Sequence, residues 1–372
     1  MPYIRRDDMS EEVVDRLTMD DSWEAVNQYY FDQGWTDGLP IVPPTEERVA
    51  AMMEYTDRDP QEVVAVLEPK KGQATIEKIA VNAVMAGCLQ QYLPVLIAAV
   101  QGIGKEGFNL YGVQTSTHNT SVLAIVNGPI ARELDINCGY NVTGNRWRST
   151  AAIGRAIGFI LTNIGGVPGA SDIHTQGHIA RFRHCIAENE GESPWEPLHV
   201  ERGFARDTST VTVFGACTPQ MIDDNGGSKS AKDLFNTFCL SIPYVGNRNT
   251  NGEGEPLVIL GPQHANTFAR DGYSKADVKK FLFERARLRF GDIPVGNLEN
   301  FSKKWHKFYC NVSPDYGVPI AEKADDIAVV VMGGKGTHSL SIQTLLGTRS
   351  MTVPITSKEG VPLSSVEKIK SS

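Results

Sequence analysis

The sequence lacks the paired cysteines and long apolar runs that mark several protein classes. None of its six cysteines forms a Cys-x-x-Cys pair, so it holds neither a zinc knuckle nor a thioredoxin-type motif. The longest apolar stretch, residues 79–100, is broken by Asn82, Gln90 and Pro94 and is too interrupted to cross a membrane. The N-terminal residues are acidic and do not resemble a signal peptide. Scattered thiols without a signal predict a cytoplasmic location.

Positive charge is also scarce. The chain of 372 residues has 44 Asp and Glu against 36 Lys and Arg, a net charge of −8. Nucleic-acid-binding domains usually carry a basic stripe, so this balance argues against such a partner, although a local arginine cluster can still bind a small anion. The 41% hydrophobic content and 35 glycines are typical of a soluble enzyme with many turns, a class that is often homo-oligomeric.

Two buried strands with the same ending organise the predicted fold. The stretches VLAIVNGP (122–129) and LVILGPQHA (257–265) both run from a hydrophobic strand into a Gly-Pro turn. Such strands alternate with Gly-rich helices, which predicts an α/β fold, either one large domain or two similar lobes. The predicted units are an N-terminal helical segment with a Pro-rich loop (1–60), a first α/β lobe with the candidate site (61–205), a second α/β lobe (206–356) and a C-terminal tail (357–372).

Two loops have several readings. The three prolines of WTDGLPIVPP (35–44) exclude a helix, and the loop is either a rigid connector or a substrate-facing segment in which Asp37 has chemical reach. Residues 327–345 are predicted to form a strand, a glycine turn and a helix. The turn, GGKGTHS, is typical of an anion cradle with Lys335 and His338, although it lacks P-loop spacing.

A polar loop before a Gly-rich helix predicts an anion site. The helix is expected to start at Ser149 or Thr150, and the loop before it holds Asn141, Arg146 and Arg148. Free N–H groups and the positive end of the helix dipole favour an anion there, and arginine adds bidentate recognition. The alternative is a set of surface salt bridges. This helix start carries neither the ATP nor the dinucleotide fingerprint, so no ATP or NAD site is predicted.

Candidate catalytic residues lie in the same region. His199 and Glu201 are expected in an extended segment, where residues two apart share a face, so the carboxylate would orient the imidazole as a general base. The alternative is a structural salt bridge. Cys138 is the favoured thiol, because arginines and a helix start nearby would lower its pKa.

Polar residues at the ends of the two buried strands are further candidates. His118 and Asn119 precede the first strand and Asn127 ends it, while His264 follows the second. Groups at strand ends often form sites in α/β proteins. We predict His118 as a catalytic residue, and Asn119, Asn127 and His264 as substrate-binding residues. A structural imidazole is the alternative for His118.

The many histidines and glutamates between residues 174 and 201 suggest a metal site. His174 and His178 have helical spacing, and Glu188 would add a carboxylate ligand. The motif is not HExxH, and Gly177 lies between the two histidines. A divalent metal is therefore an alternative cofactor, and the cofactor is otherwise unknown.

Ten stretches together resemble one protein family. They are DGLPIVPPT, NAVMAGC, IVNGPI, IGRAI, NIGG, AENE, SPWEPLHVERGF, LGPQHA, SKADVKKFL and VVMGGKGTHS. Between about Asp37 and Pro354 the chain is similar to the large proteins associated with UGSC-motif (seleno)proteins, small thioredoxin-like partners with a Sec- or Cys-Gly-Ser-Cys motif. This chain has no CGSC or UGSC motif, so the resemblance implies that a redox group comes from a separate small subunit.

Three functions remain open at this point. The first is an enzyme, a lyase or an oxidoreductase, acting on a small anionic substrate by acid–base and thiol-assisted chemistry. The second is a metal-dependent lyase or hydrolase that uses the residues from His174 to Glu201. The third is a non-catalytic binding or scaffold subunit for the small partner.

Overall fold

Helices and strands alternate along most of the chain, which confirms the predicted α/β class. The computed structural model describes residues 16–19, 22–144, 146–166, 174–177, 185–251, 254–294, 296 and 312–367. The α-helices are α1 (Trp23–Asp32), α2 (Glu46–Met53), α3 (Ile76–Met85), α4 (Leu93–Ile103), α5 (Leu110–Thr115), α6 (Pro129–Glu133), α7 (Arg148–Ile160), α8 (Leu198–Glu201), α9 (Ala231–Ser241), α10 (Pro262–Arg270) and α11 (Lys275–Arg285). The strands are β1 (Val63–Leu67), β2 (Gly72–Thr75), β3 (Ser121–Asn127), β4 (Cys185–Ala187), β5 (Thr210–Asp223), β6 (Leu257–Leu260), β7 (Arg287–Arg289), β8 (Gly317–Pro319), β9 (Ala328–Val331), β10 (His338–Thr344) and β11 (Met351–Pro354).

One long strand joins two halves of a seven-stranded sheet. The strand order is β4-β3-β5-β10-β6-β9, with β11 also paired to β5. The first part of β5, residues 210–216, lies between β3 and β11, and the remainder pairs with β10. We call β4, β3, β11 and the first part of β5 half-sheet A. Half-sheet B consists of β9, β6, β10 and the second part of β5.

The two half-sheets repeat one pairing pattern. In half-sheet A, β4 is parallel to β3, which is antiparallel to β5, which is antiparallel to β11. In half-sheet B, β9, β6, β10 and β5 follow the same pattern in that order. The fourth strand of half-sheet A is β11, which follows the strands of half-sheet B in the chain. The fourth strand of half-sheet B is the second part of β5, which continues directly from half-sheet A. The half-sheets are not two consecutive stretches of chain, and the division into 61–205 and 206–356 stays a prediction about folding units.

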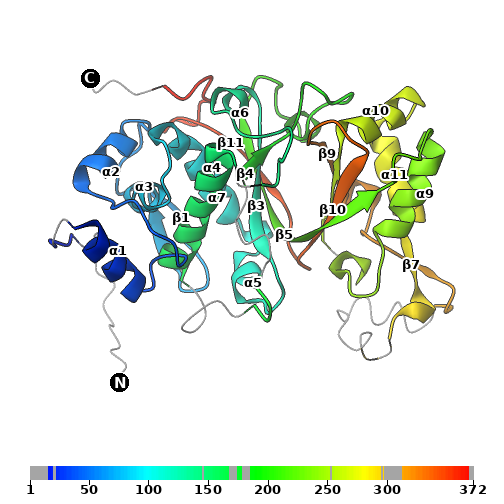
Figure 1. Ribbon diagram of the computed structural model, residues 1–372, viewed down its shortest axis with the longest axis horizontal. Helices are drawn as coiled ribbons and strands as arrows, with labels where there is room; N and C mark the ends of the chain where they lie inside the picture. The colour runs from blue at the N-terminus through cyan, green and yellow to red at the C-terminus, as the bar shows by residue number, and fades with distance from the viewer. Residues whose placement is uncertain are drawn as a thin grey trace.

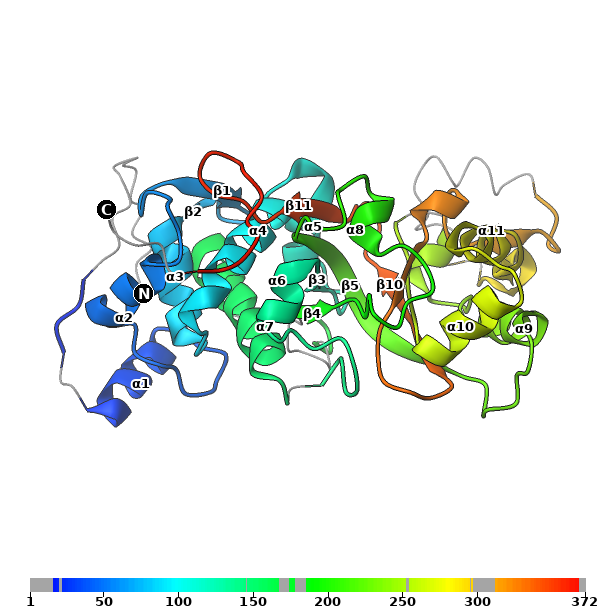
Figure 2. The same cartoon turned by 90° about the horizontal axis from the view of Figure 1, so that it is seen from above.

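Both faces of each half-sheet are buried, which explains the near-continuous hydrophobic strands. Along β3, Val122, Ala124 and Val126 pack against the helices of the first half, while Leu123 and Ile125 face the other half-sheet. Alternate residues of β6 divide in the same way. Figure 1 and Figure 2 show the result: α3, α4 and α7 cover one side of the sheet region, and α9, α10 and α11 cover the other.

The segment after the late glycine turn corrects one prediction. Residues 338–344 form strand β10, paired with β5 and β6, where a helix was predicted. The reason is visible in the pattern: apolar Leu340 and Ile342 alternate with Ser339 and Ser341, a period of two that suits a strand. The glycine turn therefore connects β9 to β10.

A bidentate ion pair holds the Pro-rich loop to α7. Arg155 donates from Nε and Nη2 to the two carboxylate oxygens of Asp37, both over 2.7 Å. The same Nη2 reaches the carbonyl of Pro40 at 2.9 Å, and the guanidinium lies over the Phe159 ring. Hydrogen bonds and the positive charge of Arg155 hold the pKa of Asp37 below its usual range, against its partial burial. These contacts support the connector reading of the loop.

The contributions of Arg155 and Asp37 to the free energy of unfolding are expected to depend on each other. Replacing Arg155 by Lys removes the planar fork, and replacing Asp37 by Asn removes the charge, so each change should lower the free energy of unfolding. Because both side chains keep contact with water, a double-mutant cycle in urea should give a coupling of about 1 kcal/mol. Strictly additive losses would show that the loop is held by other contacts.

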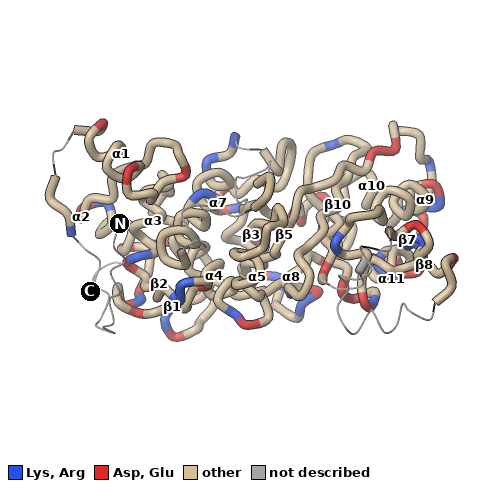
Figure 3. Tube along the Cα trace, turned by 90° about the horizontal axis from the view of Figure 1, so that it is seen from below, with Lys and Arg blue, Asp and Glu red and all other residues tan. Residues whose placement is uncertain are grey.

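The distribution of charge and the character of the helices are the remaining features of the fold. Acidic and basic positions are interspersed along the trace in Figure 3. Among the helices that the structure describes, none combines the length and apolar character needed to cross a bilayer.

Candidate functional site

The carboxyl ends of the two outer strands, β4 and β9, meet. The backbone N–H of Asn189, which follows β4, donates to the carbonyl of Val331 at the end of β9 over 2.8 Å. The N–H of Gly333 donates to the carbonyl of Cys138, also over 2.8 Å. We call these four residues the β4–β9 junction. Ligands of α/β sheets commonly bind outside the carboxyl ends of strands, so a site is expected near this junction.

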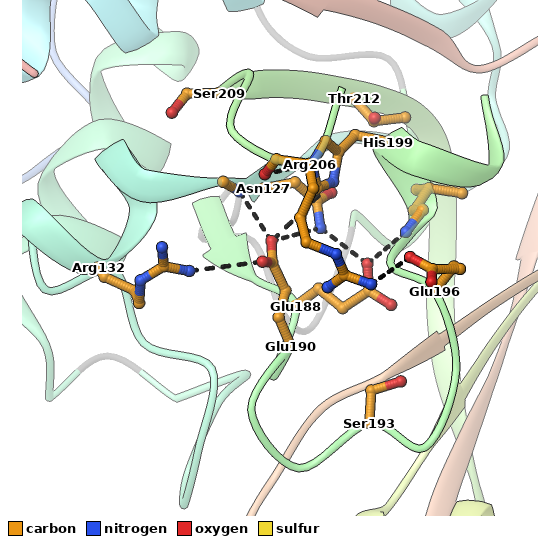
Figure 4. Close-up of polar contacts among 12 residues, drawn as sticks. Asn127, Arg132, Glu188, Glu190, Ser193, Glu196, His199, Arg206, Ser209 and Thr212 are labelled. Carbon is orange, nitrogen blue, oxygen red and sulfur yellow. Dashed lines mark hydrogen bonds and ion pairs between the residues drawn. The ribbon is translucent and has the colours of Figure 1, made fainter. Parts of the chain in front are cut away.

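Two carboxylates follow β4 and share one amide. Asn127 Nδ2, at the end of β3, lies 2.8 Å from Glu188 Oε2 and 3.2 Å from Glu190 Oε1. Glu190 Oε1 also accepts the N–H of Gly128 over 2.7 Å. Gly128 has a φ of +88°, and a Cβ there would come within 2.8 Å of the backbone of Ser209, so this turn requires glycine. Figure 4 shows these side chains converging.

His199 is the imidazole beside this pair. It lies in the short helix α8 and is fully buried. Its Nε2 lies 3.3 Å from the carbonyl of Arg206, and a carbonyl can only accept, so Nε2 carries the proton and Nδ1 is bare. Nδ1 lies 4.0 Å from Glu190 Oε1. Burial lowers the pKa of His199, which keeps the imidazole neutral near pH 7.

Three buried polar atoms at this place have no hydrogen-bond partner in the described part of the chain. They are Asn127 Oδ1, Glu188 Oε1 and His199 Nδ1. Unsatisfied buried atoms are costly and uncommon, so three together call for an explanation such as a bound molecule. We call Asn127, Glu188, Glu190 and His199 the carboxyl–histidine cluster.

The protonation of Glu188 is set by burial and by a lysine from the other half. Burial raises the pKa of Glu188, because desolvation disfavours its charged form. Lys275 at the start of α11 opposes this, with Nζ 4.0 Å from Glu188 Oε1. Hydrogen bonds from the N–H of Leu198, over 2.7 Å, and from Asn127 act in the same direction as Lys275. The raised pKa leaves Glu188 available as an acid.

Glu201 does not take the predicted position beside His199. Residues 198–201 form helix α8 rather than an extended segment, so positions two apart point in different directions. Glu201 instead binds Lys279 and lies 3.2 Å from Lys275 Nζ. These cations hold the pKa of Glu201 below its usual range despite its burial. The predicted pairing of His199 with Glu201 is therefore wrong.

Cys138 lies at the junction, but its thiol is not activated as predicted. Burial raises the pKa of Cys138, and the negative charges of Glu190 and Asp135 raise it further. The expected effect of nearby arginines does not appear. Cys138 is therefore a protonated thiol close to Glu190, and the predicted low pKa is wrong.

The predicted anion-binding arginines have other surroundings. Helix α7 begins at Arg148, so its N-cap is Trp147 rather than the predicted Ser149 or Thr150, and Trp147 makes no side-chain hydrogen bond. Arg148 is exposed and donates from Nη2 to the carbonyl of Gly87 over 3.2 Å. Arg146 and Asn141 are exposed as well. The structure brings none of them into contact with the carboxyl–histidine cluster, and an anion site at this helix start stays a prediction.

His118 and Asn119 lie at the wrong end of β3 for this site. They precede the strand, whereas Asn127 ends it, so the length of β3 separates them from the cluster. His118 Nδ1 lies 3.4 Å from Cys217 Sγ, and Asn119 donates to Thr218. Burial raises the pKa of Cys217 to about 12, so this pair holds a thiol rather than a thiolate. The surroundings favour the structural alternative for His118.

His264 lies in helix α10 and is buried next to half-sheet B. Its Nδ1 lies 2.8 Å from Ser339 Oγ, and its Nε2 lies 3.7 Å from Asp224 Oδ1. Burial lowers the pKa of His264. Its contacts tie α10 to β10 and to the end of β5, and they do not reach Asn127 or Glu188.

The metal hypothesis receives no support from the described residues. Among them, no group of three or more His, Cys, Asp or Glu side chains is arranged to hold an ion. His178 lies outside the described residues, so the set of His174, His178 and Glu188 stays a prediction. The single GxGxxG spacing, Gly102 to Gly107, begins in the last turn of helix α4 rather than after a strand and so lacks the dinucleotide-binding context.

No family model matches the chain, and no curated protein matches it. The resemblance to the proteins associated with UGSC-motif partners therefore stays a prediction.

Sequence reasoning missed Glu190, Asn189 and Lys275 as site residues. The signal for the first two was available: AENE follows directly on a buried strand, as Asn127 follows another, and carboxyl ends of adjacent parallel strands lie together. Lys275 had no such signal. It reads as an ordinary first-turn lysine of α11, and only the packing of the two halves brings it to Glu188.

Proposed function

We propose that the chain is an enzyme that moves a proton on a small anionic substrate at the carboxyl–histidine cluster. The observation that supports this is the set of three buried, unpartnered atoms: Asn127 Oδ1, Glu188 Oε1 and His199 Nδ1. A bound molecule that offers donors and acceptors would satisfy all three. Purely structural networks usually satisfy their own polar atoms.

Glu188 and His199 are suited to opposite roles. Glu188 Oε2 already accepts two hydrogen bonds, so a proton on the carboxyl group would sit on Oε1, the unpartnered oxygen, and could be donated to a substrate. His199 is neutral with a bare Nδ1, which is the state that a general base needs. Environments that move two pKa values in opposite directions are a common arrangement for acid–base catalysis.

Positive groups around the cluster favour an anionic substrate. Lys275 Nζ is 4.0 Å from Glu188 Oε1, and Arg132 lies 3.5 Å from Glu190 Oε2. Arg132 is largely exposed, so it can reorient toward an incoming anion. Both positive charges would attract a carboxylate or phosphate group toward the cluster.

The thiol-assisted part of the proposal rests on Cys138. Its half-buried thiol lies close enough to Glu190 for that charge to affect its pKa. If the small CGSC- or UGSC-type partner exists, a thiol at the β4–β9 junction is where we expect this chain to meet it. The acid–base chemistry does not depend on that partner.

The proposal predicts exchange of a substrate hydrogen with solvent. The purified chain should be incubated in deuterium oxide with a panel of small carboxylates and phosphate esters that bear acidic C–H bonds. Proton NMR should show loss of one C–H signal in at least one compound, at a rate well above that of heat-denatured protein. A panel that shows neither exchange nor turnover, with protein that is folded by circular dichroism, would contradict acid–base catalysis.

A further inference from the structure

The glycine turn after β9 lies directly at the β4–β9 junction. Its first residue, Gly333, donates to Cys138, and Asn189 Nδ2 lies 3.4 Å from the carbonyl of Gly333. Glu188 and Glu190 flank Asn189 in sequence. The turn is therefore next to the carboxyl–histidine cluster, although it comes from the other half-sheet.

The backbone of this turn offers unused donors. The N–H groups of residues 334–337 donate to no oxygen in the described part of the chain. Gly334 packs against Tyr140, since a Cβ there would lie 2.0 Å from the ring, and this contact fixes the turn. Lys335 is exposed and forms no ion pair with the described residues. Consecutive free N–H groups beside a lysine make an anion-binding concavity.

We propose that residues 333–337, which we call the cradle loop, bind the oxyanion group of the substrate whose proton the cluster moves. This inference rests on the proposed function. The cluster supplies the independent sign of a ligand, because Glu188 Oε1, Asn127 Oδ1 and His199 Nδ1 are buried and unpartnered. Half A would then provide the proton-transfer groups, and half B would provide the anion-binding loop. The substrate class is a small molecule with a carboxylate or phosphate group next to the reacting carbon.

An anion in the cradle loop would also assist the acid. A negative charge close to Glu188 disfavours the ionised carboxylate and so favours the protonated form that can donate. Lys335 balances part of that charge at the surface. Substrate binding would thus prepare the proton donor.

Titration calorimetry with two anions tests the inference. Inorganic phosphate and malonate should be titrated into the purified chain at constant ionic strength. We expect one of them to bind at one site per chain, and the tighter one distinguishes a phosphate-type from a carboxylate-type substrate. Lys335→Met should weaken binding about tenfold, because it removes the only full charge of the loop. Lys358→Met, which removes an exposed lysine far along the chain from the loop, is the matched control and should bind as the wild type does.

A second pair of variants separates this inference from the proposed function. Gly334→Val should displace the loop from Tyr140 and abolish anion binding in protein that remains folded by circular dichroism. Glu188→Gln should abolish hydrogen exchange but retain anion binding. Absence of saturable binding by either anion, or equal losses in Lys335→Met and Lys358→Met, would overturn the cradle loop. Exchange in the wild type that survives both loop variants would leave the proposed function standing without it.

Discussion

Replacing His199 by Gln is expected to lower kcat for hydrogen exchange by about 10²–10⁴-fold, the usual contribution of a positioned general base. The Gln side chain can still donate to the carbonyl of Arg206, which His199 Nε2 approaches at 3.3 Å. It offers no basic nitrogen in place of Nδ1. KM should change little, because the anion is held elsewhere. Initial rates in deuterium oxide, measured against substrate concentration, give both constants.

The matched control is His118→Gln. This histidine precedes β3 and contacts Cys217, so the same substitution there should leave kcat within about twofold of wild type, since it touches no reacting group. The pH profile adds a second check. Because burial lowers the pKa of His199, the wild-type rate should stay high as pH falls through the range in which an ordinary imidazole protonates. A His199→Gln enzyme with wild-type kcat, or a His118→Gln enzyme that loses as much, would remove His199 from the mechanism.

Much of the fold could be predicted because local patterns and tertiary packing agree. The helix caps Thr75, Ser230 and Ser274 each accept a hydrogen bond from the backbone three residues on, as is typical of Ser and Thr at helix starts. The repeated strand endings before Pro129 and Pro262 mark equivalent strands, β3 and β6, of the two half-sheets. The exchange of β11 and the end of β5 between halves could not be predicted, since pairing partners far apart in sequence leave no local signal.

The site was predictable only in part, and the reasons are physical. Asn127 was predicted because it ends a buried strand, and His199 because carboxylates surround it in sequence, whereas Glu188 was predicted only as a metal ligand. The partner of His199 was assigned wrongly, because Pro197 suggested extended chain where a single helical turn forms. The pKa of Cys138 was predicted in the wrong direction, because burial and the Glu190 charge depend on tertiary contacts.

Replacing Lys275 by Met is expected to give the largest loss of stability, about 3–5 kcal/mol, as is usual when one member of a buried ionic network is removed. Lys275 Nζ donates to the carbonyl of Glu196 over 2.6 Å, lies 3.2 Å from Glu201 Oε2 and is 4.0 Å from Glu188 Oε1. Met matches its length but pairs with none of them. Urea unfolding at several pH values measures the loss.

The loss should grow with pH, and the sign follows from Glu188. The pKa of Glu188 is raised in the folded protein, so folding favours its protonated form. The contribution of this carboxyl group to the free energy of unfolding is therefore present at low pH and is lost as pH rises through the folded pKa. Without Lys275 the folded pKa of Glu188 rises further, so the variant should be closest to wild type in acid and most destabilised at pH values above that pKa.

Two further variants decide whether Lys275 acts through this network. Lys280→Met, on the exposed side of the same helix, should cost less than about 0.5 kcal/mol, as surface substitutions do. Combining Lys275→Met with Glu188→Gln should recover part of the loss, because the second change removes the unpaired buried charge while Glu201 keeps Lys279. Losses that simply add, with no dependence on pH, would mean that Lys275 contributes only packing. Recovery would instead show that half B controls the charge of the carboxyl group on which the proposed proton transfer depends.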